Sequence, residues 1–358
     1  MLDFSKPISF SKPMPNAFAL APMTNQQSHP DGTLSDDELN WLSMRAKGGF
    51  GMVMTCAAHV SENGQGWPGA MGVFGDQHIS GLSKLAKAIT DEGSLAIVQL
   101  FHGGIRAPEA LIGQQPVSAS DHAETNARAL TTEEVQGLVQ DFIAAAVRCQ
   151  KAGMSGVELH GAHGYLICQF LSQEYNQRTD QYGGSFDNRT RFLREIIDGI
   201  DEACSDDFVV GVRLSPERMG LDFNEMRTLA TQLMASGKID FLDVSLWDSL
   251  KYPEDPAYQN KTLLEWYAEL PRHNTKLCVA GNIRTGEDVS KVMAAGVDFV
   301  AIGRAGILHH DFAKQVTENP DFTPRQTPVS RRVLAEEGLG EAFIDYMSRW
   351  PGFVEGAE

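Results

Sequence analysis

The sequence predicts a (β/α)8 barrel, a closed ring of eight parallel strands surrounded by helices. Short apolar runs typical of buried strands alternate with longer segments of helical period. There are eight such runs, and each step between them is long enough for a right-handed crossover. Barrels of this kind run from about 200 to over 400 residues as one domain. We therefore expect one barrel domain over residues 1–358, with a C-terminal segment of about 311–358 packing outside it or at a subunit interface.

The predicted strands are apolar runs bounded by glycine, proline or polar residues. In chain order they are Ala17–Met23, Gly51–Thr55, Leu95–Leu100, Gly156–His160, Phe208–Leu214, Asp240–Ser245, Lys276–Ala280 and Phe299–Ile302.

Segments of helical period fill the gaps between these strands. They are Asp36–Lys47, His78–Asp91, Thr132–Ala152, Asn188–Ala203, Asn224–Ser236, Leu263–Leu270 and Thr285–Ala295. Thr131 and Glu134 have the spacing of a capping box at a helix start. Gly153, Gly237 and Gly296 each follow a helix and precede a strand. This recurrence supports a repeating helix–strand unit.

An open doubly wound sheet is the alternative α/β fold. Its dinucleotide-binding form carries Gly-x-Gly-x-x-Gly between the first strand and the first helix. The first strand here ends instead in Ala21-Pro22-Met23-Thr24-Asn25-Gln26. Proline suits a strand end rather than a helix that opens onto a pyrophosphate, so the barrel is favoured.

Composition excludes several classes of partner. With 30 Lys and Arg against 47 Asp and Glu, the formal net charge is −17, which disfavours nucleic acid. No apolar run approaches the roughly 20 residues that span a bilayer, and the start lacks a secretory signal, so we expect a cytoplasmic protein without a membrane partner. Five scattered cysteines without a Cys-x-x-Cys pair predict reduced, mostly buried thiols rather than a metal or dithiol site.

The active site of a barrel lies at the C-terminal ends of its strands. Because side chains alternate along a strand, the apolar set faces the helices, and Gln99, His160, Arg213 and Ser245 point inward at those ends. A ring of buried polar groups is costly unless it binds something. The alternative is a satisfied polar layer in which Glu158 pairs with Arg213.

Two glycine-bearing turns, Gly281-Asn282 and Gly303-Arg304, follow the last two strands. Loops at these positions usually bind phosphate in this fold, through backbone N–H groups and a cation. Arg304 is the natural cation. The alternative is a pair of ordinary strand-to-helix turns that bind nothing.

His160, His163 and Tyr165 lie at or just beyond the end of the fourth strand. A zinc site needs a third ligand and usually a helix under the pair, and here a glycine follows each histidine. Two interpretations remain. The histidines make local hydrogen bonds in a loop, or they donate to a substrate oxygen while Tyr165 gives a proton.

Taken together, these motifs resemble the Old Yellow Enzyme family of FMN-dependent NAD(P)H oxidoreductases, from about Phe4 to His310. The most specific stretch begins with His160-Gly161-Ala162-His163-Gly164-Tyr165-Leu166 and continues through Tyr182-Gly183-Gly184-Ser185 to Arg191-Phe192. Ala21-Pro22-Met23-Thr24, Gln99-Leu100 and Gly211-Val212-Arg213 also match. Many bacterial members have cysteine where Thr24 stands and tyrosine where Gln26 stands.

The resemblance implies FMN across the barrel mouth and NADPH or NADH as hydride donor. The residues implied to hold the flavin ring are Ala21, Pro22, Met23, Thr24, Ala57, Gln99 and Arg213. Those implied to hold its phosphate are Gly281, Asn282, Gly303 and Arg304.

The same resemblance assigns the substrate side of the site. His160 and His163 would hold the carbonyl or nitro oxygen of the substrate, and Tyr165 would protonate the α-carbon while reduced flavin delivers hydride to the β-carbon. Gln26 and Trp247 would line the substrate edge.

We therefore predict an FMN-dependent ene-reductase or NAD(P)H dehydrogenase with a ping-pong mechanism. Its small-molecule substrates would be activated alkenes such as α,β-unsaturated carbonyls, or quinones, nitro compounds or nitrate esters. A flavin-free barrel isomerase or lyase acting on a phosphorylated substrate, and a non-catalytic flavin-binding protein, are the alternatives. Both a monomer and a homo-oligomer fit the sequence.

Overall fold

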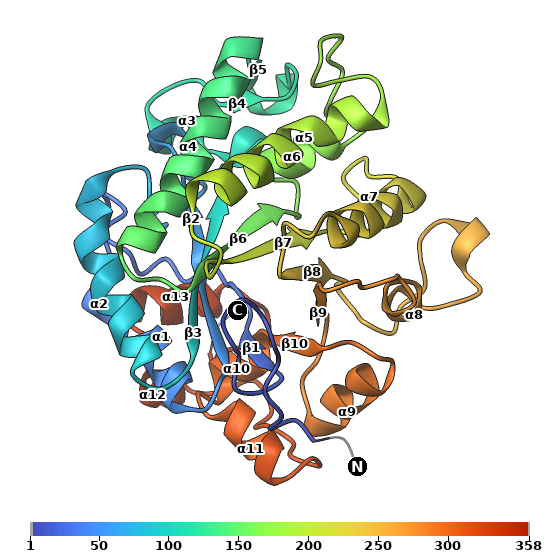
Figure 1. The fold of residues 1–358 in the computed structure, drawn as a ribbon. Coiled ribbons are helices and arrows are strands. Elements are labelled where there is room, and N and C mark those ends of the chain that lie inside the picture. The colour runs from blue at the N-terminus through green and yellow to red at the C-terminus, as the bar shows by residue number, and fades with distance from the viewer. Residues whose placement is uncertain (1–2, 357–358) are drawn as a thin grey trace.

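Eight parallel strands close into a barrel in the computed structural model, which describes residues 3–356 (Figure 1). Around the barrel the order is β1, β2, β3, β6, β7, β8, β9 and β10, and β10 pairs back with β1. The barrel strands are β1 (Phe18–Leu20), β2 (Met52–His59), β3 (Leu95–Phe101), β6 (Gly156–Gly161), β7 (Val209–Leu214), β8 (Phe241–Ser245), β9 (Lys276–Ala280) and β10 (Phe299–Ile302). The predicted fold class is confirmed.

The helices form a layer outside the strands (Figure 1). They are α1 (Asp36–Lys47), α2 (Ile79–Thr90), α3 (Glu109–Ile112), α4 (Thr132–Lys151), α5 (Leu166–Leu171), α6 (Phe186–Ala203), α7 (Phe223–Ser236), α8 (Leu263–Ala268), α9 (Gly286–Ala294), α10 (Arg304–Leu308), α11 (Phe312–Glu318), α12 (Arg331–Glu336) and α13 (Glu341–Ser348). Two short strands, β4 (Val117–Ser118) and β5 (Arg128–Ala129), pair with each other outside the barrel.

The first two strands differ most from their predicted bounds. β1 ends at Leu20 because Pro22 has no N–H with which to continue the ladder beyond Ala21. β2 extends to His59 because its register against β3 shifts between Met54 and Ala57. This one-residue bulge bends the strand and lets it continue beside β3.

The helix boundary signals are confirmed. Thr131 and Glu134 form both hydrogen bonds of the capping box that starts α4. Gly153, Gly237 and Gly296 adopt left-handed φ angles of 83°, 73° and 99°, which glycine tolerates without a Cβ clash.

Side-chain alternation separates two apolar layers. Val98, Val157 and Val212 belong to the large core between strands and helices, whereas Ile97 and Phe241 belong to a smaller core inside the barrel. The interior is therefore packed, and space for a ligand remains at the strand ends.

The C-terminal segment packs on the same chain's first helix. Phe343 of α13 meets the ring of Trp41 edge-on at 4.9 Å, and both side chains are buried. Arg45 of α1 donates to the backbone carbonyls of Glu337 and Gly306. These contacts bring α13 to the barrel mouth, and the expected single-domain organisation stays a prediction.

All five cysteines are free thiols, and four of them are buried. Within residues 3–356, no helix has both the length and the apolar character needed to cross a bilayer.

Candidate active site

Gln99, Arg213 and Ser245 lie buried at the C-terminal ends of β3, β7 and β8. Their partners form a continuous polar layer. Gln99 Nε2 donates to Glu158 Oε1 at 2.6 Å, and Arg213 Nε lies 3.1 Å from Asp243 Oδ2. The structure thus brings the predicted inward-pointing groups to one end of the barrel.

The predicted pairing of Glu158 with Arg213 is wrong. Strand register places Arg213 of β7 beside Asp243 of β8, whereas Glu158 of β6 lies beside Gly211. Side-chain alternation along single strands does not give the cross-strand register that makes Asp243 the partner of Arg213. Each carboxyl group therefore has a different polar neighbour.

His160 and His163 form a hydrogen-bonded chain that ends on Ser245. Ser215 fixes the backbone of His163, because the His163 N–H donates to Ser215 Oγ at 3.1 Å. The Ala162 backbone N–H donates to His160 Nδ1, so His160 carries its proton on Nε2 and donates to His163 Nδ1 at 3.3 Å. His163 Nε2 then donates to Ser245 Oγ at 2.7 Å. A substrate oxygen must compete with Ser245 for this proton.

Both histidines are neutral at physiological pH. Burial, with the neighbouring Arg213 guanidinium, lowers the pKa of His163 to about 3. Burial, together with His163, lowers the pKa of His160 well below its ordinary value. Neutral imidazoles can donate hydrogen bonds without contributing charge. Within residues 3–356, no cluster of His, Cys, Asp or Glu could hold a metal ion.

Tyr165 lies beside this pair. Its ring centroid is 4.9 Å from that of His160 and 5.1 Å from that of Phe101, and Arg106 Cζ lies 4.8 Å over the ring. Burial raises the pKa of the phenol, and the Arg106 charge opposes the shift. The fully buried amide of Gln169 donates to the Gly164 carbonyl at 2.7 Å, which fixes the turn that carries Tyr165.

The loop after β1 is anchored from below. Glu38 of α1 is fully buried and accepts hydrogen bonds from Asn25, Ser28 and Cys56. Thr24 is thereby held at the mouth, and Gln26 adopts a left-handed φ of 57°. No sequence motif pointed to Glu38, because its role depends on three contacts from two different segments.

A cavity of about 510 Å³ opens at the barrel mouth, within the range of about 300–1,000 Å³ typical of ligand sites. Its walls contain most of the residues expected around the cofactor or at the substrate edge, namely Ala21, Pro22, Met23, Thr24, Arg213, Trp247, Gly281, Asn282, Gly303 and Arg304. The predicted residues outside its lining are Gln26, Ala57, Gln99, His160, His163 and Tyr165. Of these, the two histidines connect to the lining residue Ser245 through the hydrogen bonds described above.

Trp247 and the C-terminal helix both contribute to the cavity wall. Trp247 is 49% exposed, adopts a left-handed φ of 60° and lies beneath Arg218, whose Cζ is 5.3 Å from its ring. Tyr346, Met347 and Trp350 line the cavity from α13 and the residues after it. The sequence did not predict these three residues, because no sequence pattern places the C-terminal end of the chain at the barrel mouth.

Two arginines make part of the cavity wall positively charged. Arg284 and Arg304 both line it, and no carboxylate among residues 3–356 forms an ion pair with either. Burial and the neighbouring Arg284 lower the pKa of Arg304. Arg284 was also missed, although it closes the Gly281-Asn282 turn. Two unneutralised cations in an acidic chain favour a bound anion.

These walls fit FMN. The cavity lining combines Arg213 on a barrel strand, apolar side chains such as Met23 and Ile307, and the two arginines Arg284 and Arg304. A Cβ built on Gly303 would contact only Met23 Sδ, at 3.7 Å, so the turn leaves its backbone open to a ligand. A planar ring with a terminal phosphate matches this set of groups.

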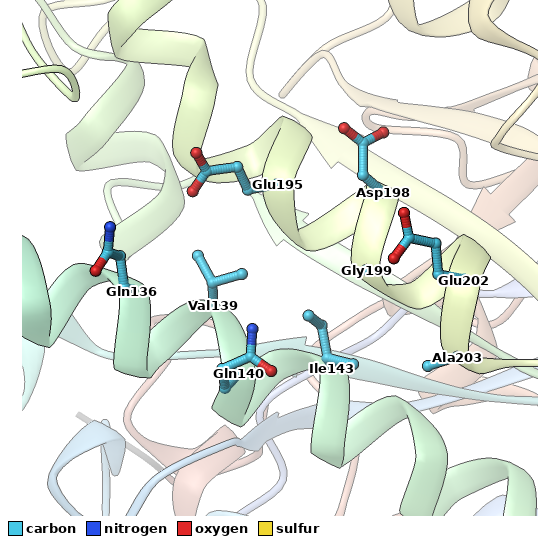
Figure 2. A pocket seen from close by; sticks show the side chains of 9 residues that line it. All are labelled: Gln136, Val139, Gln140, Ile143, Glu195, Asp198, Gly199, Glu202 and Ala203. Carbon is cyan, nitrogen blue, oxygen red and sulfur yellow. The ribbon is translucent and has the colours of Figure 1, made fainter.

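A second hollow, of about 560 Å³, lies between α4 and α6 on the outside of the barrel (Figure 2). Its lining residues are Gln136, Val139, Gln140, Ile143, Glu195, Asp198, Gly199, Glu202 and Ala203. It is away from the strand ends and its charged groups are all carboxylates. A phosphate-bearing cofactor therefore suits the mouth, not this groove.

A model of the NADH:flavin oxidoreductase / NADH oxidase family matches residues 4–321. The probable NADH-dependent flavin oxidoreductase YqiG of Bacillus subtilis (strain 168) is 39% identical over 314 residues, which cover 85% of this chain and 84% of that protein. The NADH:fumarate oxidoreductase of Klebsiella pneumoniae (strain 342) is 35% identical over 356 residues, which cover 93% of this chain and 38% of that longer protein.

Morphinone reductase, solved in complex with tetrahydroNAD, matches the fold with a TM-score of 0.78 at 26% identity, covering 96% of this chain and 97% of that one. Because the family match covers the whole barrel, the chain belongs to the NADH:flavin oxidoreductase / NADH oxidase family, the Old Yellow Enzyme family, and is an FMN-dependent NAD(P)H oxidoreductase.

Proposed function

We propose that this enzyme reduces activated alkenes, with NAD(P)H and the alkene using one pocket in turn. The observation that carries the proposal is the group of His160, His163 and Tyr165 beside the cofactor cavity. Morphinone reductase bound to tetrahydroNAD and the NADH:fumarate oxidoreductase, as their names describe them, support a nicotinamide donor and an alkene acceptor.

Each group of the site has a different role in the proposed reaction. Bound FMN supplies hydride transfer. Neutral His160 and His163 donate to the substrate oxygen and polarise the conjugated double bond. Each gives up its present hydrogen bond to do so, His160 the one to His163 and His163 the one to Ser245. The Tyr165 hydroxyl gives a proton to the α-carbon, and its raised pKa keeps it protonated for that step.

Gln26 and Trp247 are proposed to line the substrate edge. Ala21 to Thr24, Ala57, Gln99 and Arg213 are proposed to hold the ring, and the turns at Gly281 and Gly303 its phosphate. Family membership disfavours both a flavin-free isomerase or lyase and a non-catalytic flavin protein. The cytoplasmic location and the choice between monomer and homo-oligomer stay predictions.

The test separates the two half-reactions by anaerobic stopped-flow absorbance. NAD(P)H should bleach the flavin of the wild-type protein, and an enone such as cyclohexenone should restore it. Tyr165→Phe should slow reoxidation by the enone about 10²–10⁴-fold, the usual contribution of a general acid, while bleaching by NAD(P)H stays near the wild-type rate.

Tyr175→Phe, a tyrosine that packs against His122 outside the cavity, is the matched control and should leave both rates unchanged. Equal slowing of both half-reactions by Tyr165→Phe would contradict the proton-donor role. An enone that never restores the absorbance of the wild-type protein would contradict alkene reduction.

A further inference from the structure

Two carboxyl groups lie under the cofactor site and take no part in the proposed reaction. Glu158 on β6 and Asp243 on β8 have no exposed surface. Asp243 is paired with Arg213, but within residues 3–356 no cation forms an ion pair with Glu158. Its Oε2 atom is buried and has no hydrogen-bond partner. An unpaired buried carboxyl group is costly, so its presence calls for a role.

Glu158 controls the orientation of the Gln99 amide. Gln99 Nε2 donates to Glu158 Oε1 at 2.6 Å, a short contact between two buried side chains on adjacent strands. With its amino group held in this way, Gln99 directs its carbonyl oxygen away from Glu158. The flavin pyrimidine ring carries an N–H donor that such an acceptor suits.

We propose that Glu158 is a positioning residue of the cofactor site, which holds the Gln99 amide and sets the charge of the layer beneath the flavin ring. The inference rests on the proposed placement of Gln99 and Arg213 against that ring. It extends that placement to a residue that does not itself touch the cofactor.

The layer around Glu158 is coupled electrostatically. The groups that face it are Gln99 on β3, Arg213 on β7, Asp243 on β8 and Cys278 on β9. Burial, with the Asp243 charge, raises the pKa of Glu158 to about 8, and Arg213 opposes the shift. Burial also raises the pKa of Asp243 and of Cys278.

The charge of the layer therefore changes near the upper end of the physiological pH range. At pH 7 Glu158 is protonated and adds no charge to the Arg213–Asp243 pair. Above about pH 8 Glu158 ionises and adds a negative charge behind the ring. Reduction places negative charge on the ring, so this ionisation lowers the midpoint potential.

The experiment compares wild-type holoprotein with Glu158→Gln, which keeps the shape and an acceptor for Gln99 Nε2 but cannot ionise. FMN midpoint potentials are measured from pH 6 to pH 9.5. The two potentials should agree below pH 7 and diverge above about pH 8, with the wild-type value falling further. An offset that is the same at every pH, or no difference at all, would overturn the proposal.

Glu158→Asp separates the contact from the charge, because it can still ionise but no longer reaches Gln99. We expect its dissociation constant for FMN to rise about ten-fold, the equivalent of one lost hydrogen bond. Glu158→Gln should stay within about three-fold of wild type. A Glu158→Asp protein that binds FMN as tightly as wild type would overturn the positioning role.

Two further measurements keep the outcomes distinct. If the Glu158 variants do not fold, the wild-type protein alone decides the question. Its FMN midpoint potential must fall more steeply with pH above about pH 8. Gln99→Leu tests the placement on which the inference rests. Unchanged FMN affinity in Gln99→Leu would contradict the placement of Gln99 against the flavin ring. If Gln99→Leu weakens FMN binding but the effect of Glu158→Gln on the midpoint potential does not depend on pH, only the present proposal is contradicted.

Discussion

Arg284 and Arg304 differ from most cations of this acidic chain, because no carboxylate within residues 3–356 neutralises either side chain. Arg304 instead donates to Asn282 Oδ1 at 3.2 Å, which turns its guanidinium along the cavity wall. Asn282 itself has a left-handed φ of 53°, a conformation that asparagine tolerates better than most residues. One loop residue thus orients the cation that is proposed to bind the cofactor phosphate.

Arg304→Met is expected to weaken FMN binding about 10- to 100-fold, since a hydrogen bond to a charged group contributes about 1.5–3 kcal/mol. Riboflavin, which lacks the phosphate, should bind the variant and the wild type equally. Fluorescence titration of the apoprotein with both ligands measures this difference.

Arg332→Met, at an exposed arginine of α12, is the control and should change neither affinity. A loss of riboflavin affinity as large as the loss of FMN affinity would mean that Arg304 supports the fold rather than the phosphate.

At the scale of elements, the site is assembled from segments far apart in the chain. The loop after β1 is held by Glu38 of α1, and the turn after β6 by Gln169 of α5. α13 closes one side of the cavity because Phe343 packs on Trp41 of α1. We therefore expect a helix near the C-terminus to affect cofactor binding through its packing.

Phe343→Ala should lower the free energy of unfolding by about 3–5 kcal/mol, the usual cost of removing a buried phenylalanine. It should also weaken FMN binding by the folded protein, because Tyr346 and Met347 lose their support. Urea unfolding and FMN titration under native conditions measure the two effects.

Phe142→Ala is the matched control, since Phe142 is equally buried in α4 away from the cavity. It should cost similar stability and leave FMN affinity unchanged. Equal FMN affinity in both folded variants would contradict a role for α13 in the cavity wall.

At the scale of the whole molecule, the barrel buries several neutral histidines near its mouth. Burial lowers the pKa of His59 to about 4 and that of His102 to about 3, besides the effects on His160 and His163. Glu158, Asp243 and Glu38 act in the opposite sense, because burial raises their pKa values, that of Glu158 from 4.5 to about 8. The histidines whose pKa burial lowers, which also include His78, outnumber these carboxyl groups.

Stability should therefore fall as the pH decreases from about 6.5. Below that value the histidines bind protons in the unfolded chain but not in the folded one. Each such histidine lowers the free energy of unfolding by about 1.4 kcal/mol per pH unit until its folded-state pKa is reached. Urea midpoints of the apoprotein at pH 7.5, 6.5 and 5.5 measure the slope of stability against pH. The raised pKa of Glu158 reduces this slope by the contribution of one titrating group.

Replacing the exposed His29 by Gln should leave that slope unchanged, whereas His59→Gln should reduce it. Midpoints that are the same at pH 6.5 and pH 5.5 would show that the histidines titrate alike in the folded and unfolded chains.

The sequence by itself determined the barrel, because strand alternation, glycine stops and crossover lengths are local properties of the chain. Lys276–Ala280 and Phe299–Ile302 match their predicted bounds. Arg213, near the end of its strand, and Arg304, just after its strand, both line the cavity at the mouth, as their positions in the sequence indicated. The inward direction of Gln99 and Ser245 also followed from period two. Such features depend on a few neighbouring residues.

Only the tertiary structure decided which polar groups touch. The partner of Arg213 is Asp243 rather than Glu158 because register between strands depends on barrel closure, which no single strand encodes. Glu38 under the β1 loop and Tyr346 at the cavity wall likewise depend on contacts between distant segments. Local periodicity gives the face on which a side chain lies, and the packing of the whole barrel gives its neighbour.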